Sequence, residues 1–131
     1  MARTYTVKMK QDAFPLRGAL QAAIKTLGYP LTLEDDYVPF ASSGYLPCTL
    51  DGEDAGLIIR FIGSEDVTNQ NASISLQWSG DAREKVTVMI VATALASSFK
   101  ATVLDENNVE LSLAELTTST KNVLASLDKF I

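Results

Sequence analysis

The chain has 131 residues, of which 47% are apolar and 21% are charged. This length and balance predict one folded domain with its own core, and they exclude a disordered or fibrous chain. The net charge of −5 argues against a protein that binds nucleic acid or anionic membranes, because both need Lys and Arg to displace counterions.

Cysteine usage and the N-terminal sequence indicate the compartment. Cys48 is the only cysteine, so the chain cannot form an internal disulfide, and this usage suits a reducing environment. Residues 1–10 contain no apolar stretch of the kind found in a signal peptide. We therefore expect a cytoplasmic protein.

The first elements expected in chain order are a strand and a helix. Residues 4–10 alternate between polar and apolar side chains, as a half-buried strand does. Asp12 is placed to cap a helix that tolerates Pro15 in its first turn and stops at Gly28. The apolar face of this helix is expected to consist of Leu16, Leu20, Ala23, Ile24 and Leu27.

Residues 29–41 are expected to form an exposed connection. Pro30 and Pro39 would interrupt a strand ladder, and the acidic run 34–36 is too charged to bury. The segment is therefore interpreted as a surface loop between the first helix and the strands that follow.

Three consecutive strands are expected next. From Ser42 to Gly63, two apolar stretches flank the sequence Asp51-Gly52-Glu53-Asp54, and Asp-Gly is a strong hairpin signal. The second arm, residues 57–62, has the clearest strand pattern in the chain. After a polar loop at residues 64–71, residues 73–78 alternate again. Short links between successive strands predict an antiparallel meander with one apolar face.

The apolar run in residues 80–99 predicts a helix that covers this meander. Asp81 and Glu84 have the spacing of a capping box at its start. Apolar residues fall on nearly every side, so we expect the helix to be buried at the centre of the fold. It is too short and too interrupted by Ser and Thr to span a bilayer.

A short hairpin and a last helix complete the expected fold. Residues 101–104 and 109–111 flank a polar turn, and Ser112 and Glu115 form a second capping box. The apolar face of the last helix is expected to contain Leu113, Leu116, Val123, Leu124 and Leu127. Residues 1–131 are therefore predicted to form a single α+β domain, with an antiparallel sheet of about five or six strands, three helices and one central buried helix.

The residue types that carry most enzyme chemistry are missing. The chain contains no histidine, which excludes Ser-His and Cys-His catalysis and most zinc sites. Cys48 follows a proline in an expected strand, with no base nearby in sequence, and is interpreted as a small buried or half-buried thiol. The acidic clusters lack the ligand spacing of an EF-hand, and the glycines lack a phosphate-binding pattern. We expect no catalytic residue, no metal and no cofactor.

The acidic residues are concentrated in one part of the chain. Residues 34–66 hold eight acids and one base, a net charge of −7, whereas the remaining residues carry +2. Two interpretations stay open. The acids belong either to solvated loops that keep the protein soluble, or to a negative face that steers a positively charged partner.

Aromatic residues accompany these acids. Those in or beside the acidic connection are Tyr29, Tyr37, Phe40 and Tyr45. They either pack over the edge of the sheet or form an acidic and aromatic face for a protein partner, whereas Trp78 is expected in the core. On the second interpretation, the partner-binding residues are Glu34, Asp35, Asp36, Tyr37, Tyr45, Asp51, Glu53, Asp54, Glu65 and Asp66.

Two stretches carry a family resemblance. VPFASSGYLPCTLDGEDAG, from Val38 to Gly56, and QWSGDAREKVTVMIVATALAS, from Gln77 to Ser97, resemble the small cytoplasmic immunity proteins of bacterial contact-dependent and type VI polymorphic toxin systems. The resemblance implies a protein that binds one cognate toxin domain and blocks its active site. An acidic face would suit a basic toxin such as a nuclease.

Two other function classes remain open. The length, acidity and expected element order also resemble the small acidic α/β chaperones of type III secretion, which bind an unfolded effector segment and are usually dimers. The leading strand at residues 4–10 departs from that pattern, because those chaperones generally begin with the helix. The third class is a small-ligand protein or enzyme that uses carboxylates and tyrosine. The oligomeric state stays undetermined.

Overall fold

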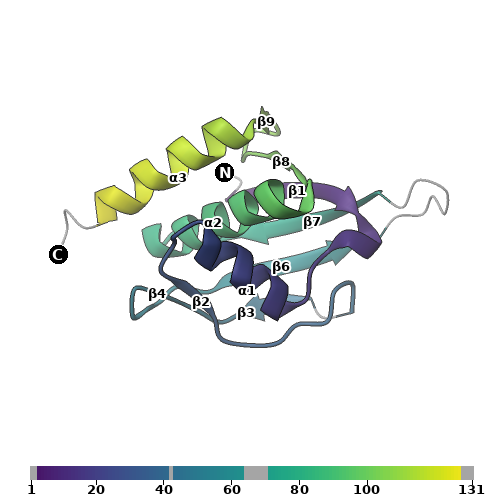
Figure 1. Cartoon of the computed structure of the whole chain (residues 1–131), viewed down its shortest axis with the longest axis horizontal. Coiled ribbons are helices and arrows are strands. Elements are labelled where there is room, and N and C mark those ends of the chain that lie inside the picture. The colour runs from purple at the N-terminus through teal and green to yellow at the C-terminus, as the bar shows by residue number, and fades with distance from the viewer. Residues whose placement is uncertain (1–2, 42, 64–70, 128–131) are drawn as a thin grey trace.

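A curved antiparallel sheet with helices on one side forms the body of the protein (Figure 1). The computed structural model describes residues 3–41, 43–63 and 71–127. The main sheet contains β1 Thr4–Lys10, β3 Gly44–Leu46, β6 Leu57–Ile62, β7 Asn71–Gln77, β8 Thr102–Leu104 and β9 Glu110–Leu111. These six strands lie in the order β3-β6-β7-β1-β8-β9, and every neighbouring pair is antiparallel.

A smaller sheet and the helices complete the structure. The smaller sheet contains β2 Leu31–Leu33, β4 Cys48–Leu50 and β5 Glu53–Asp54, in the order β2-β4-β5. The helices are α1 Arg17–Thr26, α2 Ala82–Phe99 and α3 Leu113–Leu127, with one 3-10 turn, η1, at Gln11–Ala13. The predicted α+β class, with three helices and a main sheet of about five or six strands, is confirmed. The second sheet was not anticipated.

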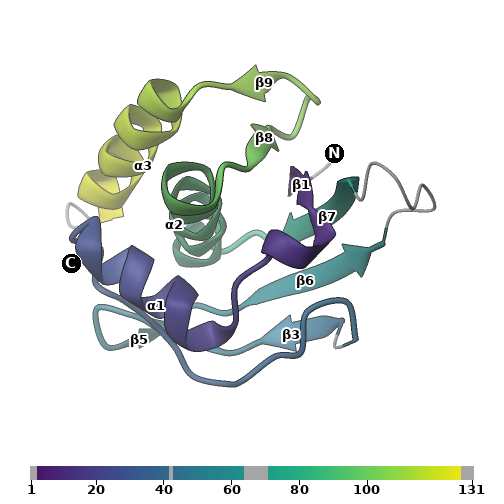
Figure 2. The same ribbon diagram turned by 45° about the vertical axis from the view of Figure 1, so that its right-hand side comes forward.

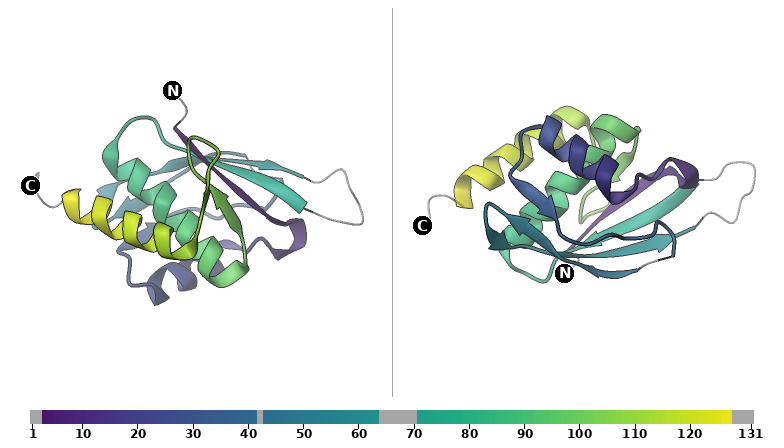
Figure 3. Two further views of the ribbon diagram at one scale, coloured as in Figure 1. Left: turned by 90° about the horizontal axis from the view of Figure 1, so that it is seen from above. Right: turned by 60° about the horizontal axis from the view of Figure 1, so that its bottom comes forward.

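Helix α2 is the centre of the core, as its sequence predicts. Figure 2 shows it almost end on, enclosed between the curved sheet and the other two helices. All ten residues from 86 to 95 are buried, including Thr87 and Thr93. Figure 3 shows α3 packed along α2 on the side away from the sheet. No helix in the described residues is long and apolar enough to cross a membrane.

The start of α2 differs in detail from the expected capping box. The Asp81 side chain accepts a hydrogen bond from the Arg83 backbone N–H at 2.8 Å, as an N-cap residue should. The Glu84 carboxylate, however, does not reach back to Asp81. It accepts hydrogen bonds from both the backbone N–H and the hydroxyl of Ser79. Asp81 therefore caps the helix as predicted, but Glu84 stabilises the turn before the helix at Ser79 and does not bond to the N-cap residue.

The first strand and the meander agree with their sequence patterns. Strand β1 has the predicted bounds, and the strands β3, β6 and β7 form the predicted antiparallel meander. The Asp51-Gly52 turn has φ values of 52° and 86°, which are the left-handed conformations that a two-residue hairpin turn requires. Ser42 and most of the predicted polar loop, residues 64–70, lie outside the described residues.

The predicted start of the first helix is wrong. Asp12 lies in η1, and α1 begins only at Arg17. Pro15 disfavours helical backbone at the preceding residue, and Phe14 is extended with φ −68° and ψ 126°. Phe14 is also buried, with its ring centroid 5.8 Å from that of Tyr37. The sequence pattern places Leu16 on the apolar face of the first helix, but Leu16 lies before α1 and is 66% exposed.

The prediction that residues 29–41 form an exposed connection is wrong in its first half. Leu31–Leu33 is strand β2, with both leucines buried against the core. Pro30 does not interrupt the ladder, because it lies before the strand and contributes only its carbonyl, which accepts the Asp51 N–H at 2.8 Å. The acidic run 34–36 is exposed, as predicted.

The C-terminal elements follow the sequence closely. Strands β8 and β9 form the predicted hairpin. The second capping box is complete, because the Glu115 N–H donates to the Ser112 hydroxyl at 3.1 Å and the Ser112 N–H donates to the Glu115 carboxylate at 3.0 Å. Leu116 is buried as expected, but Leu113 is 44% exposed and does not belong to the buried face of α3.

Candidate protein-binding surface

The small sheet displays a polar row on the side that faces away from the core. Its apolar residues point inward, and the register aligns Thr32 with Thr49 and Thr49 with Asp54. Directly paired residues share one face of a sheet, so these three side chains lie side by side. The Thr49 hydroxyl donates to the Glu34 carboxylate at 2.8 Å. Two carboxylates, Glu34 and Asp54, therefore flank Thr49.

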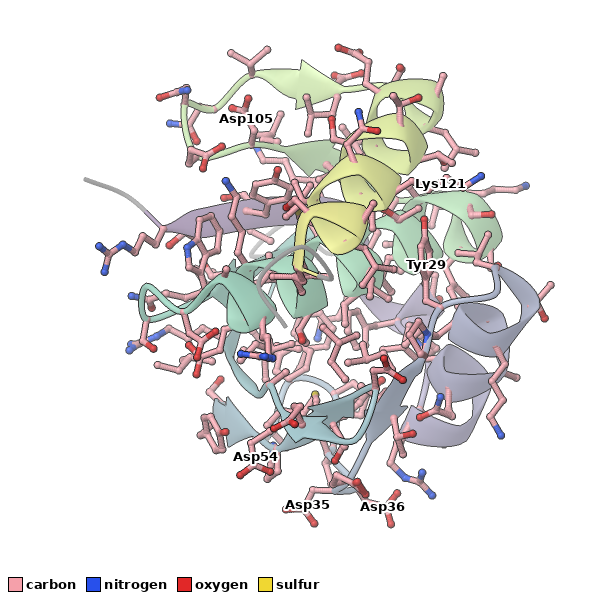
Figure 4. All side chains as sticks on the ribbon, turned by 90° about the vertical axis from the view of Figure 1, so that its left-hand side faces the viewer. Tyr29, Asp35, Asp36, Asp54, Asp105 and Lys121 are labelled. Carbon is pink, nitrogen blue, oxygen red and sulfur yellow. The ribbon has the colours of Figure 1, made fainter. Side chains whose placement is uncertain are left out.

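A shallow groove lies next to this row. It has a volume of about 270 Å³, and its lining includes Asp35, Asp36, Tyr37 and Tyr45. Figure 4 shows Asp35, Asp36 and Asp54 on the same side of the molecule. We call the five residues Glu34, Asp35, Asp36, Tyr45 and Asp54 the acidic surface. The structure thus brings together residues from the acidic connection, from β3 and from β5.

One acid of this surface is already paired. The Arg17 guanidinium Nε lies 2.6 Å from a carboxylate oxygen of Asp36, and this hydrogen bond raises the pKa of Arg17. The Asp36 side chain remains 85% exposed. Neither Asp35 nor Asp54 has a side-chain hydrogen bond or ion pair with the described residues. Their carboxylates are therefore available to a partner.

Tyr45 is the one aromatic residue of the expected set that is well exposed. Its side chain is 61% exposed and lies across the backbone of Gly56, where an added Cβ atom would overlap the ring. Leu46 pairs with Leu57, so the same register sets Pro47 opposite Gly56. Tyr45 is two residues from Pro47 and on the same face of the strand, and its side chain therefore reaches Gly56 diagonally across the outer face of the sheet. The glycine therefore lets an exposed tyrosine lie flat on the surface.

The other aromatic residues belong to the core. The Tyr37 hydroxyl donates to the Pro15 carbonyl at 2.7 Å, and burial raises the pKa of Tyr37 above its ordinary value. Tyr29 is only 7% exposed, and Phe40 packs on Phe61 with ring centroids 5.0 Å apart. For these residues the packing interpretation is correct. Tyr37 borders the groove but holds the fold, and Trp78 is buried as predicted.

The remaining candidate residues are separate from the groove. Asp51 and Glu53 are exposed at the hairpin turn, at the far end of β4 from β3. Glu65 and Asp66 lie outside the described residues.

Cys48 is the buried thiol that the sequence indicates. It is 3% exposed, and burial, reinforced by the charge of Glu34, raises the pKa of the thiol to about 12. A thiol with such a pKa is a poor nucleophile near neutral pH, because the thiolate is the reactive form. Within the described residues, no group of three His, Cys, Asp or Glu side chains could hold a metal ion.

A second hollow was missed by the sequence reasoning. It has a volume of about 480 Å³ and is lined by Lys8, Lys10 and Lys100 together with Phe99. The alternation of Lys8 and Lys10 on β1 was visible in the sequence, but Lys100 joins them only because α2 ends beside β1. Among the described residues, no carboxylate lines this hollow.

Comparisons with known proteins add no relative. No protein-family model matches the chain, and neither curated proteins nor solved structures gave a significant match.

Proposed function

We propose that this protein is an immunity protein that binds and neutralises a cognate bacterial toxin domain in the cytoplasm. The observation that carries the proposal is the acidic surface, where Asp35 and Asp36 line a groove with the exposed Tyr45 and the carboxylates of Glu34 and Asp54 flank Thr49 on the adjoining small sheet. The protein acts by binding alone, and its partner is a basic folded domain.

Charge and exposure both support this function. The acidic surface lies in the part of the chain that carries a net charge of −7, so its field attracts a basic partner and speeds association. A flat exposed tyrosine surrounded by polar groups is typical of the residues that contribute most binding energy in interfaces. A nuclease domain suits this surface, because a site that binds a polyanion must itself be basic.

The function is tested with the full chain in its native host. The tagged protein is used to capture partners at moderate and at high salt. The captured protein is then expressed alone and together with the chain. We expect one toxin-sized domain that is lost at high salt, that stops growth when expressed alone, and that is harmless when the chain is present.

Two charge-reversal variants make this test specific for the acidic surface. Asp35→Lys with Asp54→Lys alters the surface, and neither carboxylate has a side-chain partner among the described residues. Asp12→Lys with Glu110→Lys changes the net charge equally, at exposed positions elsewhere. Capture should fail with the first variant and persist with the second. Equal loss in both would leave only a general charge effect, and no loss in either would refute the proposal.

A type III secretion chaperone is the second candidate. After β1, the chain runs helix, strands, helix, hairpin, helix, as that resemblance implies, although six strands in the described residues lie between α1 and α2 where the resemblance implies three. Val109 and Leu113, next to β9, are 55% and 44% exposed and could contact an apolar segment. This function predicts capture of a large secreted protein through an unfolded segment, with little dependence on salt or on Asp35 and Asp54.

A further inference from the structure

Residues 44–59, from β3 to β6, form one hairpin with a continuous pairing register. This register fixes the side of the strand to which each backbone N–H and C=O points. Leu50 pairs with Glu53 beside the two-residue turn, and the Ala55 N–H donates to the Cys48 carbonyl at 2.9 Å. Backbone groups of successive strand residues alternate between the two sides. In the first arm of the hairpin, residues 44–50, the even-numbered residues therefore direct their backbone N–H and C=O groups toward β5 and β6. Leu46 and Gly44 are among them.

The odd-numbered residues of the same arm point to the opposite side, toward β2. The Asp51 N–H donates to the Pro30 carbonyl at 2.8 Å, and the Glu34 N–H donates to the Pro47 carbonyl at 3.0 Å. Continuing this register would place Asp36 opposite Tyr45. The chain does not continue it, because β2 ends at Leu33 and the acidic run turns away to leave the groove beside β3.

The backbone of Tyr45 is consequently an open sheet edge. Its N–H and C=O face the groove and have no ladder partner among the described residues. Its side chain lies on Gly56 and does not cover that edge. Free strand edges are usually covered or blocked, since they readily pair with another strand.

We propose that this edge accepts an extended basic segment of the partner protein as an added strand. Its backbone would bond the N–H and C=O of Tyr45, and its Lys or Arg side chains would meet Asp35 and Asp36 across the groove. The inference rests on the proposed function and specifies how the acidic surface binds. A second copy of this chain is a poorer occupant, because it would bring the same carboxylates against Asp35 and Asp36.

Amide exchange tests whether the edge is open. In the ¹⁵N-labelled full chain, we expect the Tyr45 amide to exchange rapidly while the Leu46 amide, which bonds toward β6, is protected. A Tyr45 amide as protected as that of Leu46 would overturn the proposal, because the edge would already be paired. Protection that rises with protein concentration would identify a second copy as the occupant and also overturn it.

A peptide titration tests the occupant. The probe is a short capped peptide that alternates Lys and Thr, and its control alternates Glu and Thr. We expect the Lys peptide alone to shift the amides of residues 44–46 and to protect Tyr45 from exchange. Absence of these changes, or equal changes with the Glu peptide, would overturn the proposal.

Two substitutions separate the backbone from the side chain. Tyr45→Ala removes the ring, whereas Tyr45→Pro removes the ring and the N–H, and proline is tolerated where an edge N–H faces outward. Circular dichroism checks that both variants fold. Tyr45→Pro should bind the Lys peptide about fivefold more weakly than Tyr45→Ala, the effect of roughly one hydrogen bond. Equal affinities would overturn the added strand.

The outcomes distinguish this inference from the proposed function. If a captured toxin is neutralised equally by Tyr45→Pro and Tyr45→Ala, the immunity function stands and the added strand fails. If the Lys peptide binds at β3 but no toxin is captured, the added strand stands and the immunity function fails.

Discussion

Thr93 on α2 and Thr120 on α3 place their hydroxyl oxygens 3.1 Å apart in a completely buried seam between the two helices. The Thr93 hydroxyl also lies 2.7 Å from the Met89 carbonyl, to which it donates. A hydroxyl has one proton, so Thr120 must be the donor between the two threonines. This pair is the one polar link between the buried faces of α2 and α3 in the described residues.

Removing the two hydroxyls should have unequal effects. Thr93→Val leaves the Thr120 donor buried without its acceptor and should lower the free energy of unfolding by about 1–3 kcal/mol. Thr120→Val leaves Thr93 bonded to Met89 and should cost less. The double variant should be more stable than the sum of the single effects predicts. Urea unfolding measures all three, and strictly additive losses would show that the two hydroxyls do not interact.

Gly56→Ala should reduce partner binding without unfolding the protein. The added methyl group occupies the place of the Tyr45 ring, which is exposed and can turn away. We expect affinity to fall as in Tyr45→Ala, by about 1–2 kcal/mol or on the order of tenfold, with no further loss in the double variant. Calorimetric titration with the captured toxin or the Lys peptide measures this.

The matched control is Gly18→Ala, the same substitution on α1. A Cβ atom there meets nothing within 4 Å. Replacing a helical glycine should stabilise the protein by about 0.5–1 kcal/mol and leave binding unchanged. If both alanine variants bind normally, the position of the Tyr45 ring does not matter for the partner.

Arg17→Gln should strengthen binding of a basic partner. The substitution releases Asp36 from its 2.6 Å ion pair and adds a free carboxylate to the acidic surface. Because the pair is exposed and screened by solvent, we expect only a small gain in affinity, of less than about fivefold, and little change in stability. Association rates at low salt are the most sensitive measurement. Lys25→Gln removes the same charge from the other end of α1, and an equal gain there would point to net charge alone.

Cys48 should be chemically silent in the folded protein. Burial raises the pKa of its thiol to about 12, so the thiolate is scarce at pH values near 8 and the side chain is enclosed. Ellman's reagent should detect no thiol in the native protein and one per chain after urea unfolding. Rapid labelling of the native protein would contradict this burial.

Stability should also fall as the pH rises from the unfolded thiol pKa of about 9 toward 12, because the unfolded state loses its proton first.

Acid should remove the contribution of the second capping box. The hydrogen bonds with Ser112 lower the pKa of Glu115 in the folded state. A lowered pKa contributes stability above the unfolded pKa, and this is lost as the pH falls through the folded pKa. The stability advantage of the wild type over Glu115→Gln should therefore be present at about pH 7 and vanish toward about pH 3. Glu110→Gln is the control, and an advantage that persists in acid would refute the prediction.

Local patterns determined much of this fold. The alternation in residues 4–10 predicts β1 with its correct bounds, and the Asp-Gly pair predicts the hairpin turn. The Ser112 and Glu115 spacing predicts the start of α3. These features need only neighbouring residues to form, so the local sequence is sufficient.

The errors occurred where distant residues compete with local preference. Leu31–Leu33 is a strand because it can pair with β4, although prolines and acids surround it. Helix α1 starts late because Pro15 disfavours helical backbone at Phe14 and because Phe14 packs into an aromatic cluster with Tyr37 and Phe61. Neither contact is visible in a local window.

The sequence by itself determined an acidic α+β domain with one apolar central helix, a single cysteine and no histidine. The tertiary structure alone decided which acids and which tyrosine share a surface. Asp35 and Asp36 approach Tyr45 because β2 pairs with β4 and then leaves the ladder. Asp54 joins them because the hairpin turn brings β5 beside β4. Sequence separation does not encode these distances, which follow from strand register and from the burial of Leu31 and Leu33.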